Sequence, residues 1–113
     1  MGNNRYEGIS GEYSAVKYLE SIGYEILETN FTSYSGEIDI VAKDGDYIVF
    51  AEVKNRMNLK YGRPIEAITP LKVKKIRKTA EFYIIKNRCA DRNMRFDVIE
   101  ILRGEVTHTK NAF

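Results

Sequence analysis

The chain has little of what builds covalent cross-links or thiolate metal sites. It has 113 residues with one cysteine, one histidine, two prolines and no tryptophan. The single cysteine, Cys89, excludes an internal disulfide and is typical of a reducing compartment. Cys89 has no second metal-type ligand close in sequence, and no base, acid or nucleophile near the single histidine, His108, gives that residue a role. We therefore predict no zinc site and interpret both as structural residues.

Long apolar runs are also missing. No segment approaches the roughly 20 apolar residues of a membrane-spanning helix, and the first ten residues lack the apolar centre of a signal peptide. With 18 basic and 16 acidic residues, the net charge of +2 neither requires nor excludes a polyanionic partner. We therefore expect a cytoplasmic protein with no membrane partner, and a single domain over residues 1–113.

Periodicity and turn residues predict an α/β fold. The predicted elements are a helix over about 4–22, a strand over 24–31, two strands over 36–43 and 46–56, a loop over 58–64, a helix from Pro70 with Thr69 as N-cap, a strand over 94–102 and a short final strand over 105–109. The order α-β-β-β-α-β, with one more strand, predicts a mixed β-sheet flanked by helices.

The two central strands contain the most informative pattern. They flank Asp44-Gly45, a dipeptide that favours a two-residue hairpin turn because both central residues must tolerate positive φ. With these two residues as the turn, cross-strand partners sum to 89, so that Asp39 faces Phe50 and Glu37 faces Glu52.

Alternation along these strands gathers charge on one face. Glu37, Asp39, Glu52 and Lys54 all project from the same side of the hairpin. Glu52 would lie diagonal to Asp39, at a Cβ separation of about 7–8 Å. Two carboxylates at that spacing can converge on one divalent cation.

The apolar residues of the hairpin indicate how far each face is covered. The opposite face is predicted to be the main core side, with Ile38, Ile40, Ala42, Val49, Ala51 and Val53. Val41, Ile48 and Phe50 accompany the acids, so we expect their face to be partly covered too. Charges in a half-covered cleft are costly unless they are paired or bind an ion. The ordinary alternative is a solvent-facing hairpin with cross-strand salt bridges.

A family resemblance bears on this choice. Asp39, followed after twelve residues by Glu52-Val53-Lys54, resembles the Asp…(Asp/Glu)-x-Lys signature of the restriction-endonuclease-like superfamily, although Ile38 stands where its named pattern has proline. The whole chain is similar to the YraN family of uncharacterised endonuclease-like proteins, and more distantly to archaeal Holliday-junction resolvases. The matching residues are Gly8, Glu12, Ala15, Leu19, Gly23, Asn30, Gly36-Glu37-Ile38-Asp39, Glu52-Val53-Lys54, Arg56, Gly62, Pro64, Lys72, Ala80, Arg95-Phe96-Asp97-Val98 and Asn111-Ala112-Phe113.

The resemblance implies a restriction-endonuclease-like fold and a metal-dependent endonuclease that hydrolyses DNA phosphodiester bonds, with branched or structured DNA as a possible substrate. Asp39, Glu52 and the carbonyl of Val53 would hold Mg²⁺ or Mn²⁺, since hard cations prefer oxygen ligands. Lys54 would assist the attacking water and steady the phosphate.

Two further acids are implied only by the resemblance. Glu12 on the first helix would be an outer acid of the site, although an ordinary surface position is an equal alternative. Glu37 would orient water or serve as an additional ligand when a second ion binds.

Basic residues outline a candidate nucleic-acid surface. Arg56 and Arg63 follow the Lys54 strand, and the planar guanidinium suits bidentate phosphate contacts. The start of the second helix carries Lys72, Lys74, Lys75, Arg77 and Lys78. Either phosphate contact or a solvated face explains these cations. Tyr34, Tyr47 and Tyr61 could stack on unpaired bases, with plain packing as the alternative.

Three classes of function remain open at this point. The favoured class is the DNA endonuclease, because Asp39, Glu52 and Lys54 occur together. The second is a non-catalytic nucleic-acid-binding module that keeps the nuclease fold. The third is a protein-interaction domain, which would show little salt-dependent DNA affinity. A homodimer is expected for a nuclease that cuts opposing strands, because two nicks require two sites.

Overall fold

The computed structural model describes residues 3–56 and 68–113, and side chains over 11–55 and 68–113. The predicted loop at 58–64, with Tyr61 and Arg63, lies outside these residues. The elements are α1 (Asn3–Ser21), β1 (Glu25–Ser33), β2 (Gly36–Asp44), β3 (Tyr47–Arg56), α2 (Pro70–Lys86), β4 (Asn93–Leu102) and β5 (Glu105–Thr109).

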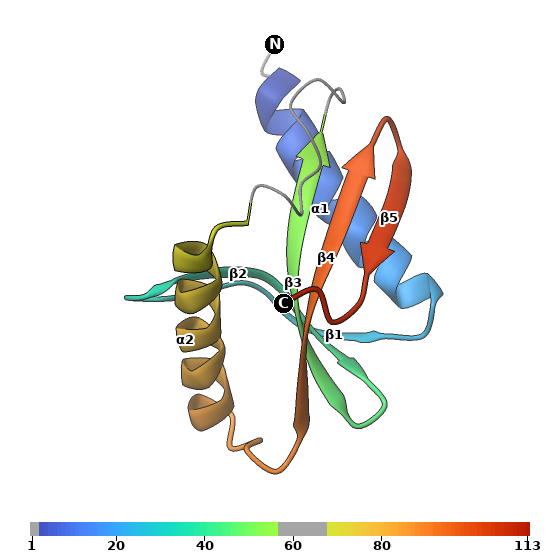
Figure 1. Ribbon diagram of the computed structural model, residues 1–113. Coiled ribbons are helices and arrows are strands. Elements are labelled where there is room, and N and C mark those ends of the chain that lie inside the picture. Colours follow the sequence, from blue (N-terminus) through green and yellow to red (C-terminus); the bar gives the residue numbers. More distant parts are fainter. Residues whose placement is uncertain (1–2, 57–67) are drawn as a thin grey trace.

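The strands form one five-stranded mixed sheet in the order β1-β2-β3-β4-β5 (Figure 1). Strands β3 and β4 are parallel and the other neighbours are antiparallel. The parallel pair requires a crossover, and this crossover contains α2. The predicted α/β class, a mixed sheet flanked by helices, is confirmed. Within the described residues, no helix has the length and apolar character that a membrane crossing requires.

Helix α2 begins where the sequence predicts. The Thr69 hydroxyl accepts a hydrogen bond from the backbone N–H of Lys72 at 3.2 Å, and Pro70 occupies the first helical position. Proline has no N–H to leave unpaired there. The residues that α2 buries recur every three or four positions and are Ile76, Thr79, Ala80, Tyr83 and Ile84. Helix α2 packs against the sheet through this stripe.

The hairpin turn differs from the predicted one. Asp44 pairs with Tyr47, so Gly45 and Asp46 form the turn, and the predicted pairing of Asp39 with Phe50 is wrong. Gly45 has φ +57°, which suits glycine as the first central residue of a type II′ turn. Asp44 remains in the strand, where its carboxylate accepts a hydrogen bond from Arg95 at 2.9 Å.

The new register also changes how the two carboxylate residues are related. Cross-strand partners sum to 91, a slip of two residues, which leaves the side chains of the paired ladder on their predicted faces. The paired ladder ends at Ile40 and Ala51. Asp39 and Glu52 are the next residues beyond this ladder, so the predicted diagonal relation, which rested on the other register, does not apply.

Both faces of the sheet carry a full core. Under α2, the buried residues are Phe31, Ile38, Val41, Ile48, Phe50, Ile76, Ala80, Tyr83, Ile84 and Phe96. Under α1, they are Ala15, Leu19, Tyr24, Ile40, Ala42, Val49, Ala51, Ile99 and Ile101. The prediction of one main core side is therefore wrong, and Ile38 packs with the α2 cluster. The face that holds the acids is covered rather than half open.

Candidate active site

The candidate site begins where β2 and β3 stop pairing. Beyond Ile40 and Ala51 the two strands no longer form a ladder, and Asp39 Oδ2 accepts a hydrogen bond from the backbone N–H of Val53 at 2.7 Å. A backbone donor inside a sheet needs an acceptor. The Asp39 carboxylate supplies it, and this bond fixes the orientation of the side chain.

Glu52 is a buried acid next to Asp39. Its residue exposure is 8%. Burial, followed by the hydrogen-bonding contact with Asp39 and the charge of Asp39, raises the pKa of Glu52 from 4.5 to about 7. The two carboxyl groups therefore share one small space. Two carboxyl groups at such short range resist being ionised together, because their negative charges repel each other. A cation between them would relieve this repulsion.

Two lysines complete the cluster. Lys72 Nζ of α2 lies 3.4 Å from Glu52 Oε2. Burial lowers the pKa of Lys54, and the neighbouring Lys72 lowers it further, against the opposing effect of Glu52. Burial also acts to lower the pKa of Lys72, but contacts with Lys54 and Glu52 outweigh it and the pKa is raised. Lys72 therefore keeps its proton more firmly than Lys54.

One oxygen of this cluster lacks a proper donor. Among the described side chains, Glu52 Oε2 is a buried atom without a hydrogen-bond partner, although Lys72 stands at ion-pair distance. The ammonium is close but is not aligned for a hydrogen bond. The burial cost of this oxygen is therefore only partly offset by Lys72, and a further cation in contact with it would be stabilising.

The donor set suits a hard divalent cation. Two carboxylates and a backbone carbonyl are oxygen ligands, and Mg²⁺ commonly binds one or two protein carboxylates while it keeps several waters. No group of three or more Asp, Glu, His or Cys side chains that could hold a metal lies in the described ranges. The site therefore fits a partly hydrated ion better than a closed structural metal.

No described contact joins the other two predicted acids to this cluster. Glu12 on α1 accepts a hydrogen bond from Asn30 Nδ2 at 2.7 Å, and the described contacts do not join it to Asp39 or Glu52. Glu37 is exposed on β2. Arg56 ends β3, but its side chain, like all of Arg63, lies outside the described part of the chain.

The predicted basic residues separate into two groups. Lys74, Lys75 and Lys78 are exposed on α2, whereas Lys72 contacts Glu52. The sequence pattern placed Lys72 among the phosphate contacts, and its position beside Glu52 was not predicted. The signal was present, because Lys72 lies four residues before Ile76 and thus on the buried stripe of α2.

Comparisons with known proteins give the family. A family model described as the uncharacterised protein family UPF0102 matches residues 11–101. The chain belongs to the UPF0102 family. A UPF0102 protein of Clostridioides difficile is 49% identical over 113 residues, covering 98% of this chain and 99% of that protein. One from Persephonella marina is 48% identical over 107 residues, covering 95% and 92% respectively. The predicted membership in the YraN family is confirmed.

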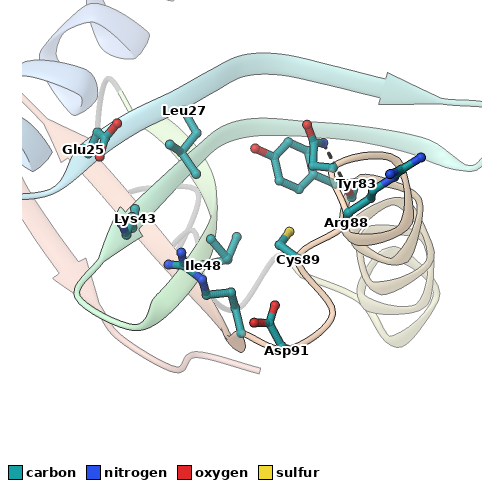
Figure 2. A pocket seen from close by; sticks show the side chains of 10 residues that line it. Glu25, Leu27, Lys43, Ile48, Tyr83, Arg88, Cys89 and Asp91 are labelled. Atoms are coloured by element: carbon teal, nitrogen blue, oxygen red, sulfur yellow. Dashed lines mark hydrogen bonds between the residues drawn. The ribbon is translucent and has the colours of Figure 1, made fainter.

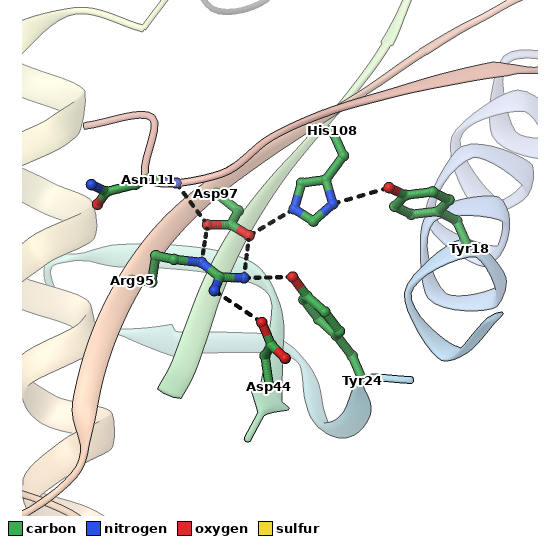
Figure 3. Close-up of polar contacts among 7 residues, drawn as sticks. All are labelled: Tyr18, Tyr24, Asp44, Arg95, Asp97, His108 and Asn111. Carbon is green, nitrogen blue, oxygen red and sulfur yellow. Dashed lines mark hydrogen bonds and ion pairs between the residues drawn. The ribbon is translucent and has the colours of Figure 1, made fainter. Parts of the chain in front are cut away.

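The UPF0102 chain also contains a buried polar network that sequence reasoning missed (Figure 3). Asp97 on β4 is fully buried. Its carboxylate accepts hydrogen bonds from Arg95 Nε at 2.9 Å and from the backbone N–H of Asn111 at 3.0 Å. His108 Nε2 lies 2.7 Å from Asp97 Oδ2, and Tyr18 of α1 contacts the other ring nitrogen. His108 therefore has a structural role in linking β4, β5 and α1.

Charge complementarity stabilises this network. Burial by itself raises the pKa of Asp97, but hydrogen bonds from His108, Arg95 and Asn111 outweigh it and the pKa is lowered. Arg95 also contacts Asp44 at the hairpin turn. The network thereby fixes the end of the hairpin opposite to the one that carries Asp39 and Glu52.

The UPF0102 protein also has a surface pocket that is separate from the charged cluster in its lining residues (Figure 2). It measures about 420 Å³, and its lining includes Glu25, Leu27, Lys43, Ile48, Tyr83, Arg88, Cys89 and Asp91. Asp39, Glu52 and Lys54 do not line it. Burial raises the pKa of the Cys89 thiol, so the pocket gains no activated nucleophile. The charged cluster is therefore the stronger candidate for a catalytic site.

Proposed function

We propose that this UPF0102 protein is a divalent-metal-dependent endonuclease that hydrolyses phosphodiester bonds in DNA. The supporting observation is the half-buried Asp39 carboxylate beside the buried Glu52, whose Oε2 lacks an aligned donor. A pair of acids held this close is costly for the fold when one buried oxygen has only a misaligned ammonium beside it. Cation binding explains why the chain keeps it.

Asp39, Glu52 and the Val53 carbonyl would hold Mg²⁺ or Mn²⁺. When bound, the ion would stabilise negative charge on the phosphate and lower the pKa of a water in its shell. Asp39 keeps its orientation through the Val53 N–H, so one ligand is already placed before the ion arrives.

Lys54 contributes charge and proton exchange on the same side. It follows Glu52 by two residues on β3, so both side chains project from one face. Its lowered pKa makes the ammonium a better proton donor at neutral pH than an ordinary lysine. Lys54 would thereby steady the nucleophile and the developing charge on the phosphate.

Lys72 has a different role in the absence and in the presence of the divalent cation. Without a divalent cation, its ammonium partly neutralises Glu52. With a cation held by Glu52, Lys72 would no longer be needed to offset the charge of Glu52 and would be free to contact the phosphate. The side chain is 39% exposed, so such a movement does not require the core to rearrange.

Cleavage assays test the proposal. Purified protein is incubated with linear, flap, fork and four-way DNA and with RNA, in Mg²⁺, Mn²⁺, Ca²⁺ or chelator. Asp39→Ala and Glu52→Ala are prepared identically to exclude a contaminating nuclease. We expect cleavage by the wild type in Mg²⁺ or Mn²⁺ only, and none by either variant. Cleavage that persists in chelator, or in both variants, contradicts the proposal.

A non-catalytic nucleic-acid-binding module is the second candidate. The Lys72–Glu52 ion pair favours it, because a cation of the chain itself already contacts the acid. This candidate predicts DNA binding in Ca²⁺ and no nicking in Mn²⁺. Calorimetric titration with Mn²⁺ also distinguishes the two candidates. Only the nuclease requires that the wild type binds Mn²⁺ and that Asp39→Ala abolishes this binding.

A further inference from the structure

The turn of the β1–β2 hairpin carries the most exposed large aromatic side chain that the structure describes. Strand β1 continues to Ser33, beyond the predicted end at residue 31, so only Tyr34 and Ser35 form the turn. Tyr34 is 83% exposed. A ring this open gains no stabilisation from burial. Its presence at a defined position therefore calls for a role outside the core.

The hairpin tip is held firmly against α2. Ser33 Oγ lies 3.1 Å from Thr79 Oγ1, and the Ser35 N–H donates to Ser33 Oγ at 3.0 Å. A Cβ added at Gly36 would lie 3.6 Å from Lys75 Cβ, which places Lys75 beside the hairpin. Figure 1 shows the tip passing α2 and emerging beyond it. Tyr34 is thus presented on a fixed support.

A second ring extends this surface. The Phe82 ring of α2 lies 5.0 Å from the Tyr34 ring, edge to face at 81°, and Phe82 is 37% exposed. An edge-to-face contact uses the edge of one ring and leaves other ring faces open. We name Tyr34 and Phe82 the aromatic platform.

Cations border the platform on α2. Lys75, Lys78 and Phe82 are spaced by three and four residues and therefore share one face of the helix. Lys75 and Lys78 are both exposed. Aromatic rings beside lysines are the elements with which proteins bind unpaired nucleotides, through base stacking and phosphate contacts.

The platform lies at a consistent distance from the candidate active site along two elements. From Lys72 to Phe82, ten helical steps span about 15 Å. From Asp39 to Gly36, three extended steps span about 10 Å, and Tyr34 lies two residues further, in the turn. Since a stacked strand rises about 3.4 Å per nucleotide, the helical distance corresponds to roughly four nucleotides.

We propose that the aromatic platform, with Lys75 and Lys78, binds an unpaired DNA strand about four nucleotides from the cleavage centre. This deepens the proposed function, on which its link to cleavage rests, by naming the substrate class. The substrate is DNA with a single-stranded segment next to the bond that is cut, such as a flap or fork. A continuous duplex would leave the platform unused.

Fluorescence anisotropy tests the proposal without cleavage. Labelled oligothymidine of 15 nucleotides and a 15-base-pair duplex serve as probes, in chelator and in the Asp39→Ala background. We expect Tyr34→Ala to weaken oligothymidine binding about tenfold and to leave duplex binding unchanged, since one stacked base contributes about 1–3 kcal/mol. Tyr34→Trp should retain binding.

The matched control is Tyr13→Ala. Tyr13 is 60% exposed on α1, and Lys17 Nζ lies 5.4 Å from its ring centre, so it reproduces an exposed tyrosine beside a lysine on the other helix. Its removal should leave oligothymidine binding unchanged. Equal losses in Tyr13→Ala and Tyr34→Ala overturn the proposal, as does an unchanged affinity in Tyr34→Ala.

Failures of the two proposals remain distinguishable. Tyr34-dependent binding of oligothymidine without any nicking supports the platform and contradicts the nuclease. Metal-dependent nicking with no effect of Tyr34→Ala supports the nuclease and overturns the platform. If Tyr34→Ala instead converts a dimer to a monomer in sedimentation and leaves oligothymidine binding intact, the surface is a protein contact and the platform proposal is wrong.

Discussion

The Asp39 carboxylate accepts a hydrogen bond from the backbone N–H of Val53 at 2.7 Å. This bond occurs where β2 and β3 separate, so a side chain replaces the acceptor that a neighbouring strand would otherwise provide. The next side chain back along β3, that of Glu52, then lies against the same carboxylate. The end of the ladder thus creates both the space of the candidate site and the close approach of its two carboxyl groups.

Lys54 should matter for turnover more than for binding. We expect Lys54→Ala to lower kcat by about 100-fold or more, because it removes a charge and a proton donor used in the transition state. The Kd for DNA in Ca²⁺ should change by less than about twofold, since phosphate contacts elsewhere supply the affinity. Single-turnover cleavage and anisotropy measure the two quantities. An unchanged kcat would remove Lys54 from the mechanism.

Lys72 should compete with the divalent cation. At pH 8.5, where Glu52 is ionised, we expect Lys72→Met to tighten Mn²⁺ binding roughly fivefold, or about 1 kcal/mol, because a partly exposed ammonium no longer repels the ion. Isothermal titration calorimetry gives the Kd. Lys74→Met, an exposed neighbour, is the control and should have no effect. Weaker Mn²⁺ binding in Lys72→Met would show that the lysine supports the ion.

The buried acid should make stability fall as pH rises. The pKa of Glu52 is about 7 in the fold against 4.5 as its ordinary value, so between these values the folded state holds one more proton than the unfolded state. The free energy of unfolding then decreases with pH, by at most about 1.4 kcal/mol per unit from this group, and levels off above 7.

Urea denaturation in chelator from pH 4.5 to 8 measures this effect. Glu52→Gln should flatten the decline and be more stable than the wild type at pH 8, whereas Glu37→Gln, an exposed acid, should keep the wild-type slope. Parallel profiles for wild type and Glu52→Gln would contradict the buried charge.

Asp97 should stabilise the fold rather than the chemistry. Removing it leaves Arg95 without its buried partner, so we expect Asp97→Ala to lower the free energy of unfolding by about 3 kcal/mol or more at pH 7. Asp91→Ala, an exposed control, should stay within about 0.5 kcal/mol. Because the pKa of Asp97 is lowered in the fold, its stabilisation is present above its ordinary value of 3.8 and is lost as pH falls through the lower folded pKa.

Gly11 should not tolerate alanine, although replacing glycine by alanine usually stabilises a helix. Alanine in place of glycine normally stabilises a helix by about 1 kcal/mol. At Gly11, however, a Cβ would lie 2.7 Å from Asn55 Nδ2 and 2.9 Å from Asn55 Cβ. We therefore expect Gly11→Ala to destabilise the protein by about 1–3 kcal/mol in urea denaturation. The exposed Glu20→Ala should show little change, and a stabilised Gly11→Ala would contradict the close approach of α1 to β3.

Local physics explains which features the sequence predicted. Thr69 and Pro70 mark the start of α2 because capping and the fixed φ of proline act within one turn. Alternation puts Asp39, Glu52 and Lys54 on one face because each side chain reverses direction from its neighbour. That result survived a register error, since a slip of two residues preserves the face.

Contacts between segments far apart in the chain could not be predicted from these local patterns. The turn moved to Gly45 and Asp46, which leaves Asp44 in the strand for Arg95, 51 positions later in the chain. Tyr18 contacts His108 across 90 positions. The packing of α2 decides that Lys72 stands beside Glu52. Local sequence patterns determine the face of a strand or helix on which most side chains lie. Burial and charge pairing across the assembled sheet determine which other side chains they contact.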